Sequence, residues 1–216
     1  MGAWVSELPA PTRAEERVTS ATIPGRAGNL TLKQGDNIHE GYVRECRITV
    51  RADADFATLL TWLSGEGEAV FSNESDRQYF AHIAAAVKFA KEGNSLKTAV
   101  IPFYVEPHKG QYPPEPSVAV TTSASIFNPG TVDAKPLIKI TGASAADITL
   151  TINDTAYTYD DVTGDIYVDC DAQIVTAGGV IWSGDYDATF PVLQVGANTI
   201  SISGGTCEIT PRWRWF

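Results

Sequence analysis

The chain has 216 residues, 16 Lys and Arg against 26 Asp and Glu, and a formal net charge of −10 at pH 7. This length suits one large β domain or two small ones, and such a chain buries enough surface to fold without disulfides. The acidic excess argues against general binding to nucleic-acid phosphates and to anionic membranes, because both require clustered Lys and Arg.

The first half of the chain predicts strands around one helix. Residues 1–18 are rich in proline and are expected to form an arm or an irregular edge, and residues 17–23 alternate like a strand. Residues 42–52 place Arg44, Arg47 and Arg51 among apolar residues, which predicts a strand with one wet face and a bulge.

A short helix is predicted near residues 55–64. Asp53 or Asp55 is expected to cap its start and Gly65 to end it. The helix should present one apolar stripe to the core, made by Phe56, Leu59, Leu60 and Leu63.

Residues 68–72 and 96–107 are further predicted strands, whereas residues 78–93 fit either a helix or a strand. Residues 108–117 concentrate Pro and Gly and predict a linker or a domain boundary. After it come about ten short strands with turn residues between them and no convincing helix, which predicts a β-sandwich or jelly roll.

The segment 159–171 is rich in aspartate. It is predicted to be a polar hairpin, with Thr163-Gly164 in its turn and the aspartates on the wet face. A calcium site is the weaker alternative, because the spacing is not that of an EF-hand loop.

No catalytic constellation is visible. The histidines His39, His82 and His108 occur in unrelated places, and the chain has none of the common nucleophile, metalloprotease or phosphate-loop motifs. Three distant cysteines, Cys46, Cys170 and Cys207, indicate neither a zinc site nor disulfides. We therefore expect no enzyme activity, no metal and no cofactor.

The N-terminus lacks the pattern of a secretory signal, and no apolar run has membrane-spanning length. We expect free thiols and a soluble protein that is kept in the cytosol until it is used.

The last residues alternate basic and aromatic side chains. In a strand, Trp213 and Trp215 share one face and Arg212 and Arg214 share the other. We expect this segment to be a structural strand that closes the second sandwich, with its aromatic face inward.

Exposed aromatic residues leave a carbohydrate-binding module as the alternative function. A stacking face would use Trp182, Tyr186, Tyr157, Tyr159 and Tyr167, although large aromatic residues usually pack between the sheets.

Several segments, in order along the chain, resemble the distal tail proteins of siphophages. They are TIPGRAGNLTL (22–32), FNPGTVDAKPLIKITG (127–142), IYVDCDAQIV (166–175), DATFPVLQVGANTISISG (187–204) and PRWRWF (211–216). The resemblance implies a mainly β fold with two β-sandwich domains. Residues 1–110 would be tail-tube-like and form a ring, residues 111–122 a linker, and residues 123–216 a galectin-like domain. It also implies that residues 79–90 form a strand.

The implied role is structural: a hexameric ring at the distal tail that joins the tail tube protein to tail hub, tail-associated lysin or fibre proteins. The implied location is the virion tail, after assembly in the host bacterial cytoplasm. The sandwich edges, flanked by residues 25–41 and 72–78, would provide the contacts between copies. The candidate interface residues are Arg26, Asn29, Leu30, Lys33, Asn37, Asn73 and Arg77.

Two departures from the family stand out: the N-terminal arm is short and the second domain is compact. A galectin-like fold does not carry sugar binding with it. DNA would pass through the ring without specific binding, and the net charge suggests an acidic channel that prevents sticking.

Overall fold

The computed structural model describes residues 3–33, 35, 38–51, 56–187 and 189–216. The chain divides into two compact units, residues 1–112 with Phe216, and residues 113–215. The boundary lies within the Pro- and Gly-rich segment that the sequence singles out. Strands dominate both units, so the predicted mainly β class is confirmed. No helix among the described residues is long and apolar enough to cross a membrane.

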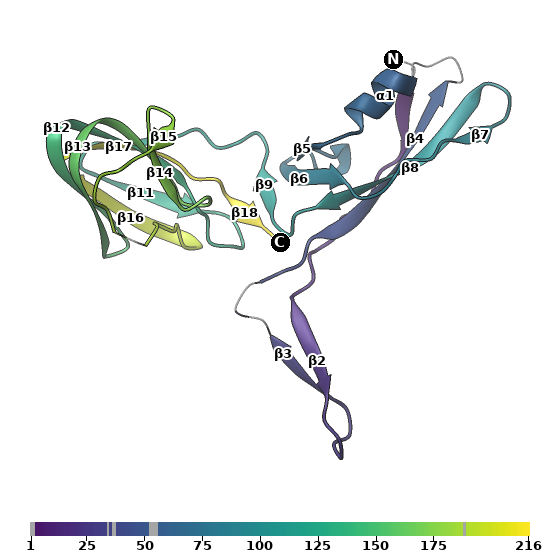
Figure 1. The fold of residues 1–216 in the computed structure, drawn as a ribbon, viewed down its shortest axis with the longest axis horizontal. Helices are drawn as coiled ribbons and strands as arrows, with labels where there is room; N and C mark the ends of the chain where they lie inside the picture. The colour runs from purple at the N-terminus through teal and green to yellow at the C-terminus, as the bar shows by residue number, and fades with distance from the viewer. Residues whose placement is uncertain (1–2, 34, 36–37, 52–55, 188) are drawn as a thin grey trace. The chain divides into compact units, whose positions relative to one another are not determined.

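The first unit is built on one antiparallel sheet with the strand order β1-β4-β8-β6-β9, to which β5 and β7 add at β6 and β8. A helix and a separate two-stranded sheet complete it (Figure 1). The elements are β1 (Ala3–Glu7), β2 (Val18–Thr22), β3 (Asn29–Lys33), β4 (Tyr42–Arg51), α1 (Phe56–Trp62), β5 (Glu66–Ala69), η1 (Ser72–Glu74), β6 (Arg77–Ile83), β7 (Ala90–Glu92), β8 (Leu96–Val105) and β9 (Lys109–Gln111).

The helix α1 confirms the predicted helix, and it covers the apolar face of the sheet. Leu59 and Leu63 pack with Cys46, Ile48 and Val50 of β4 in one core cluster. The predicted stripe is wrong in one position, because Leu60 is 47% exposed. The expected caps Asp53 and Asp55 lie outside the described residues, as does the side chain of Phe56.

The irregular edge expected within residues 1–18 is present as the edge strand β1, which pairs with β4 and has a register shift between Val5 and Glu7. Two other predictions for the first unit need correction. The pairing of β4 with β8 has no bulge. Residues 79–90 form a strand only as far as Ile83, and the chain returns to strand at Ala90.

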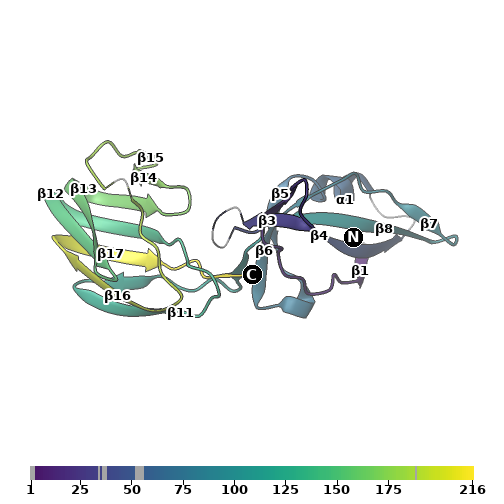
Figure 2. The same ribbon diagram turned by 90° about the horizontal axis from the view of Figure 1, so that it is seen from below.

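The second unit is a single sheet of eight strands that folds around one core. The order β10-β17-β12-β13-β14-β15 is extended by β16 and β11, since the second half of β12 pairs with β16 (Figure 2). Its strands are β10 (Val118–Val120), β11 (Ser123–Asn128), β12 (Leu137–Ile152), β13 (Thr155–Asp169), β14 (Ile174–Ala177), β15 (Val180–Ile181), β16 (Gly196–Ser203) and β17 (Gly205–Thr210). The expected linker 111–122 therefore includes a strand of this unit.

Residues 137–169 form one long hairpin of β12 and β13, where the sequence predicts a series of separate short strands. It turns at Asn153 and Asp154, whose φ angles of 48° and 66° give the two-residue turn that right-twisted strands favour. The predicted turn at Thr163-Gly164 is wrong, because Gly164 lies within β13 opposite Gly142. A Cβ at Gly142 would lie 2.6 Å from the Val162 carbonyl oxygen, so both strands run close together here.

The end of the chain departs from a regular strand. Arg212 has a φ of 55°, and only Arg214 and Trp215 form a strand, β18 (Arg214–Trp215). Trp213 is buried in the core of the second unit and Trp215 packs against that core. Arg212 and Arg214 pair with Asp169 and Asp171 at 2.8 and 2.6 Å.

The three cysteines are free and buried. Burial raises the pKa of Cys170 and of Cys207 to about 12, so both thiols are unreactive at neutral pH.

Candidate assembly interface

The hairpin of β2 and β3 has no core of its own. Among the described strands, β2 and β3 pair only with each other, from Val18–Lys33 to Thr22–Asn29 (Figure 1). Val18 is 47% exposed and Leu32 is 52% exposed. Val18 is paired with Lys33 and Leu32 with Thr19, so the two apolar side chains lie on opposite faces of the hairpin. Because an isolated two-stranded hairpin is at best marginally stable in water, both faces need a partner.

The hairpin is basic. Residues 17–33 include Arg17, Arg26 and Lys33 and no Asp or Glu. At its base, the Arg17 amide donates to the Ile38 carbonyl at 2.8 Å, and the Glu40 amide donates to the Glu15 carbonyl at 2.9 Å. The ion pairs Arg17–Glu40 and Lys33–Glu16 are exposed and add little, so the backbone ladder fixes the base.

A buried arginine lies beneath the segment that leads to this hairpin. The Arg44 side chain is 1% exposed, and its Nη2 atom lies 2.7 Å from Glu74 Oε2. The same nitrogen donates to the carbonyls of Pro9 and Ala10 at 3.2 and 3.1 Å. One guanidinium thus joins β4 and η1 to the N-terminal segment.

Aromatic rings enclose the same guanidinium. Its central carbon lies 4.5 Å from the ring centres of both Phe71 and Tyr79. The Nε and Nη1 atoms of Arg44 are buried and make no hydrogen bond. Attraction to the two ring faces partly compensates for those missing bonds.

Glu74 also forms an ion pair with a second cation, because Lys109 Nζ lies 3.1 Å from Glu74 Oε1. Arg44, Glu74, Lys109, Phe71 and Tyr79 thus form one buried cluster. Burial alone would raise the pKa of the Glu74 carboxyl. The nearby Tyr79 hydroxyl, Lys109 and Arg44 outweigh burial and hold that pKa below its usual value, although the buried hydroxyl makes no hydrogen bond of ordinary geometry with a described residue. Burial, followed by the neighbouring Glu74, raises the pKa of the Tyr79 phenol. The carboxylate therefore stays ionised and the phenol stays protonated at neutral pH.

Two further hydrogen bonds hold the N-terminal segment. Asn73 Nδ2 donates to the Pro9 carbonyl at 2.9 Å, and the Tyr42 hydroxyl donates to the Thr12 carbonyl at 3.0 Å. Together with Arg44 they fix residues 9–12 against the sheet. This cluster sets where the chain leaves for β2, and it thereby positions the hairpin.

The structure separates the predicted interface residues into two groups. Arg26, Asn29, Leu30 and Lys33 belong to the hairpin, whereas Asn37 lies outside the described residues. Asn73 is exposed and donates to the Pro9 carbonyl, whereas Arg77 is half-buried and pairs with Asp76 at 2.7 Å.

Sequence reasoning missed the inward orientation of Arg44, although a signal was present. Every second side chain of a strand points to the same face, so Arg44 lies on the buried face of β4 with Cys46, Ile48 and Val50. Val43 lies on the other face and is 50% exposed. The predicted wet face is therefore wrong for Arg44.

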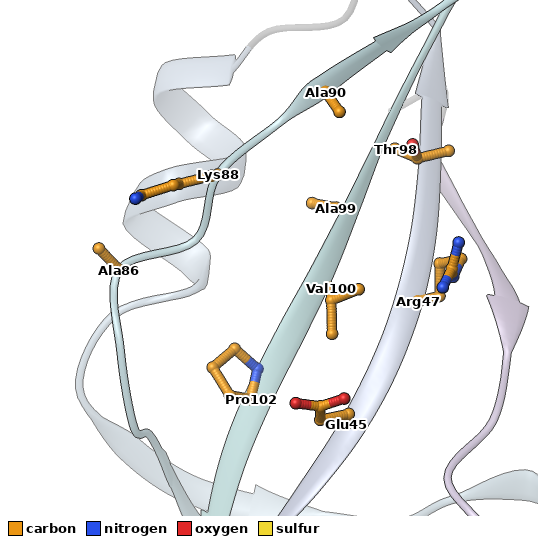
Figure 3. Close-up of a pocket in the computed structure, with 9 residues that line it drawn as sticks. All are labelled: Glu45, Arg47, Ala86, Lys88, Ala90, Thr98, Ala99, Val100 and Pro102. Carbon is orange, nitrogen blue, oxygen red and sulfur yellow. The ribbon is translucent and has the colours of Figure 1, made fainter.

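A groove of about 490 Å³ opens where residues 84–89 leave the edge of β8 (Figure 3). Glu45, Arg47 and Lys88 lie at its border, with Val100 between them. It contains none of the nucleophile–base arrangements that catalysis requires. Within the described residues, no group of three or more His, Cys, Asp or Glu side chains is placed to hold a metal ion.

The aromatic residues of the alternative carbohydrate face do not lie on one surface. Tyr157 and Tyr159 belong to the core, while Tyr167 is 38% exposed. Trp182 and Tyr186 stack on each other at 6.0 Å. The five-residue stacking face of the alternative function is therefore not formed.

The net charge is divided unevenly between the units. Residues 1–112 carry 12 Lys and Arg against 14 Asp and Glu, a net −2, and residues 113–216 carry 4 against 12, a net −8. The expected acidic channel was inferred from the charge of the whole chain. Because the unit expected to line the ring is nearly neutral, that charge does not support it.

No family model matches the chain, and a search of curated proteins finds no match. Among solved structures, the chain is similar to the one described as "Crystal Structure of SPP1 Dit (gp 19.1) Protein, a Paradigm of Hub Adsorption Apparatus in Gram-positive Infecting Phages". The TM-score is 0.73 at 16% identity, and the match covers 99% of this chain and 94% of that chain. The chain therefore has the fold of this phage protein over both of its units, which confirms the fold expected from the resemblance.

Proposed function

We propose that the chain is a structural protein of a phage or prophage tail, which forms a ring at the distal tail. The observation that carries this proposal is the likeness to SPP1 Dit over 99% of the chain. A likeness confined to one β-sandwich would fit many functions, whereas an entire two-unit architecture is far more specific. We further propose that the protein is not an enzyme.

In this proposal the ring is a homo-hexamer closed by a heterologous contact, in which two different patches of each copy meet. The basic hairpin β2–β3 is the first patch, because its apolar side chains have no core within their own copy. The second patch is the outer edge of β1, where Trp4 is 48% exposed and Val5 is 50% exposed. Glu7 of β1 forms an exposed ion pair with Arg47 of the same copy at 3.3 Å, and its carboxylate can share this charge with the basic hairpin of the neighbour.

The proposed partners are the tail tube protein on one side, and tail hub, tail-associated lysin or fibre proteins on the other. The proposed location is the virion tail, reached from the host bacterial cytoplasm. DNA would pass through the ring without base-specific contacts, and no membrane contact is proposed.

The ring is tested by light scattering at high protein concentration, together with electron microscopy of negatively stained particles. The wild-type protein should form six-fold particles, alone or when co-expressed with the tube protein. Leu32→Lys should reduce the mass to that of a monomer, because it places a charge on the apolar surface of the hairpin. Val195→Lys is the matched control, since Val195 is 50% exposed on the second unit.

If neither the protein alone nor its mixture with the tube protein gives a six-fold or helical arrangement, the ring proposal fails. If Val195→Lys disrupts the particles and Leu32→Lys does not, the contact lies on the second unit instead of the hairpin.

A further inference from the structure

The strand β15 ends the sheet of the second unit at an open edge. It follows β14 in the strand order and, among the strands that the structure describes, pairs with β14 alone, through Thr176–Ile181 and Ala177–Val180. Val180 is 69% exposed and Ile181 is 75% exposed, the highest values among the large apolar side chains that the structure describes. This edge therefore offers apolar side chains with no cover in the described part of the chain.

The backbone of β15 is oriented to accept another strand. Gly178 and Gly179 have φ angles of 56° and 83° and make a two-residue turn between β14 and β15. In such a hairpin, hydrogen-bonded pairs alternate with pairs that are not bonded. The Trp182 amide donates to the Val175 carbonyl at 2.9 Å, so Val175 and Trp182 form a hydrogen-bonded pair. The next pair toward the turn, Thr176–Ile181, is therefore not hydrogen-bonded across the hairpin. The N–H and C=O of Ile181 consequently point outward, away from β14.

Edge strands of soluble proteins are usually protected by a charged side chain, a proline or a bulge. Neither residue of β15 provides such protection. The exposed face also continues inward from the edge, because Tyr167, Thr176 and Ile181 form one cross-strand row over β13, β14 and β15. Tyr167 is 38% exposed, so an added strand would find an apolar contact beyond the edge itself.

The segment that follows β15 is acidic, and Lys139, which lies opposite Tyr167 in the same cross-strand row, is already paired with Asp165 at 2.8 Å. Asp185 and Asp187 follow β15 in the chain, and the Asp185 carbonyl accepts from the Asp160 amide at 3.0 Å, which brings these residues together with Asp161. Within the described residues, none of the four carboxylates forms an ion pair with Lys or Arg. By contrast, Lys139, Arg212 and Arg214 neutralise the aspartates elsewhere on β13 and after it.

We propose that the edge of β15 is a docking site for an extended segment of another protein, which adds as a strand beside Ile181. The segment carries aliphatic side chains alternating with Lys or Arg. Pairing of this edge with the same edge of a second copy is disfavoured, because it would bring together two units that each carry a net −8. The main-chain hydrogen bonds supply affinity, and the charges select the partner. This inference does not depend on the proposed ring.

The test uses the full chain, labelled with ¹⁵N, and a synthetic peptide of sequence Lys-Val-Lys-Val-Lys-Val-Lys with blocked ends. Chemical-shift changes should be largest at residues 174–182, with the Ile181 amide among them. A peptide with Glu in place of Lys should bind at least about tenfold more weakly, equivalent to a loss of about 1.4 kcal/mol.

Ile181→Pro removes the outward N–H without breaking a bond of the hairpin, so the protein should stay folded and binding should fall at least about tenfold. Ile181→Thr is the matched control, because it keeps the amide and the β-branched shape, and it should bind within about threefold of wild type. No shift changes at residues 174–182, or equal binding of both peptides, would overturn the proposal. Concentration-dependent shifts at this edge without peptide would identify a second copy as the occupant and overturn it too.

Discussion

Arg44 allows the clearest test of how the hairpin is positioned. In Arg44→Ala, the cluster loses the ion pair to Glu74 at 2.7 Å, two bonds to backbone carbonyls, and the stacking between Phe71 and Tyr79. Breaking a buried ion pair typically costs about 3–5 kcal/mol. Lys109 still balances Glu74 at 3.1 Å, so we expect the lower end of that range, about 3 kcal/mol.

The matched variant is Arg44→Lys. It keeps the positive charge beside Glu74 but loses the planar group that stacks between two rings and reaches two carbonyls. We expect about half of the loss seen for alanine, in the range of about 1–2 kcal/mol. The difference between the two variants separates charge from shape.

Hydrogen exchange followed by mass spectrometry is the suitable assay, because a chain of two units does not give one unfolding free energy. A loss of about 3 kcal/mol should raise the opening of the first unit by about 100-fold, provided that exchange follows this unfolding. Peptides that cover β4 and residues 71–79 should show it, while peptides from β12 and β13 should keep their protection. Unchanged exchange in β4, or equal loss in both units, would refute the role given to Arg44.

Three further predictions concern Glu74 in the first unit and Trp213 and Gly204 in the second. The pKa of Glu74 is lower in the folded state than in the unfolded state. The stability that this carboxylate contributes is therefore present above the unfolded pKa of about 4 and is lost as the pH falls through the lower folded pKa. Glu74→Gln should reduce this loss of stability in acid, measured by hydrogen exchange in the first unit. Trp213→Ala should destabilise the second unit by about 3–5 kcal/mol in urea titrations followed by exchange, without affecting the first unit. Gly204→Ala should destabilise the second unit by well over 2 kcal/mol, because its Cβ would lie 2.1 Å from the Asp147 carbonyl oxygen. Gly25→Ala has the same φ of 83° and nothing within 4 Å, so it should cost only the left-handed strain of about 1–2 kcal/mol.

The fold was predictable where periodicity is strong. Local sequence features predict three parts of the fold. They are the alternating side chains of β4, the end of the helix near Gly65, and the series of strands and turns after residue 117. The long β12–β13 hairpin was not predictable in this way. Gly142 and Gly164 pair with each other in the middle of this hairpin. Glycine and threonine are common turn residues, so the sequence at Thr163-Gly164 predicts a turn until the strand pairing is known.

The candidate interface is harder to predict, for a physical reason. Leu30 and Leu32 of β3 alternate with polar residues as in an ordinary strand, and nothing local shows that no second layer covers them. Burial is a tertiary property, so only the structure reveals that the hairpin exposes both of its faces. The ring contacts proposed for Arg26, Asn29, Leu30 and Lys33 remain predictions.

The arrangement of Arg44 also bears on what the hairpin is for. Burying a guanidinium is costly, and apolar residues at such a position are often as stable or more stable. The bonds of Arg44 to Pro9 and Ala10, however, fix the segment that precedes the hairpin, which apolar side chains could not do with the same geometry. A hairpin that served only as a flexible loop would gain nothing from such an anchor. A hairpin that must meet a second copy in one orientation gains preorganisation, because less conformational freedom is lost on contact. The buried cluster therefore fits an assembly element held in place before its partner arrives.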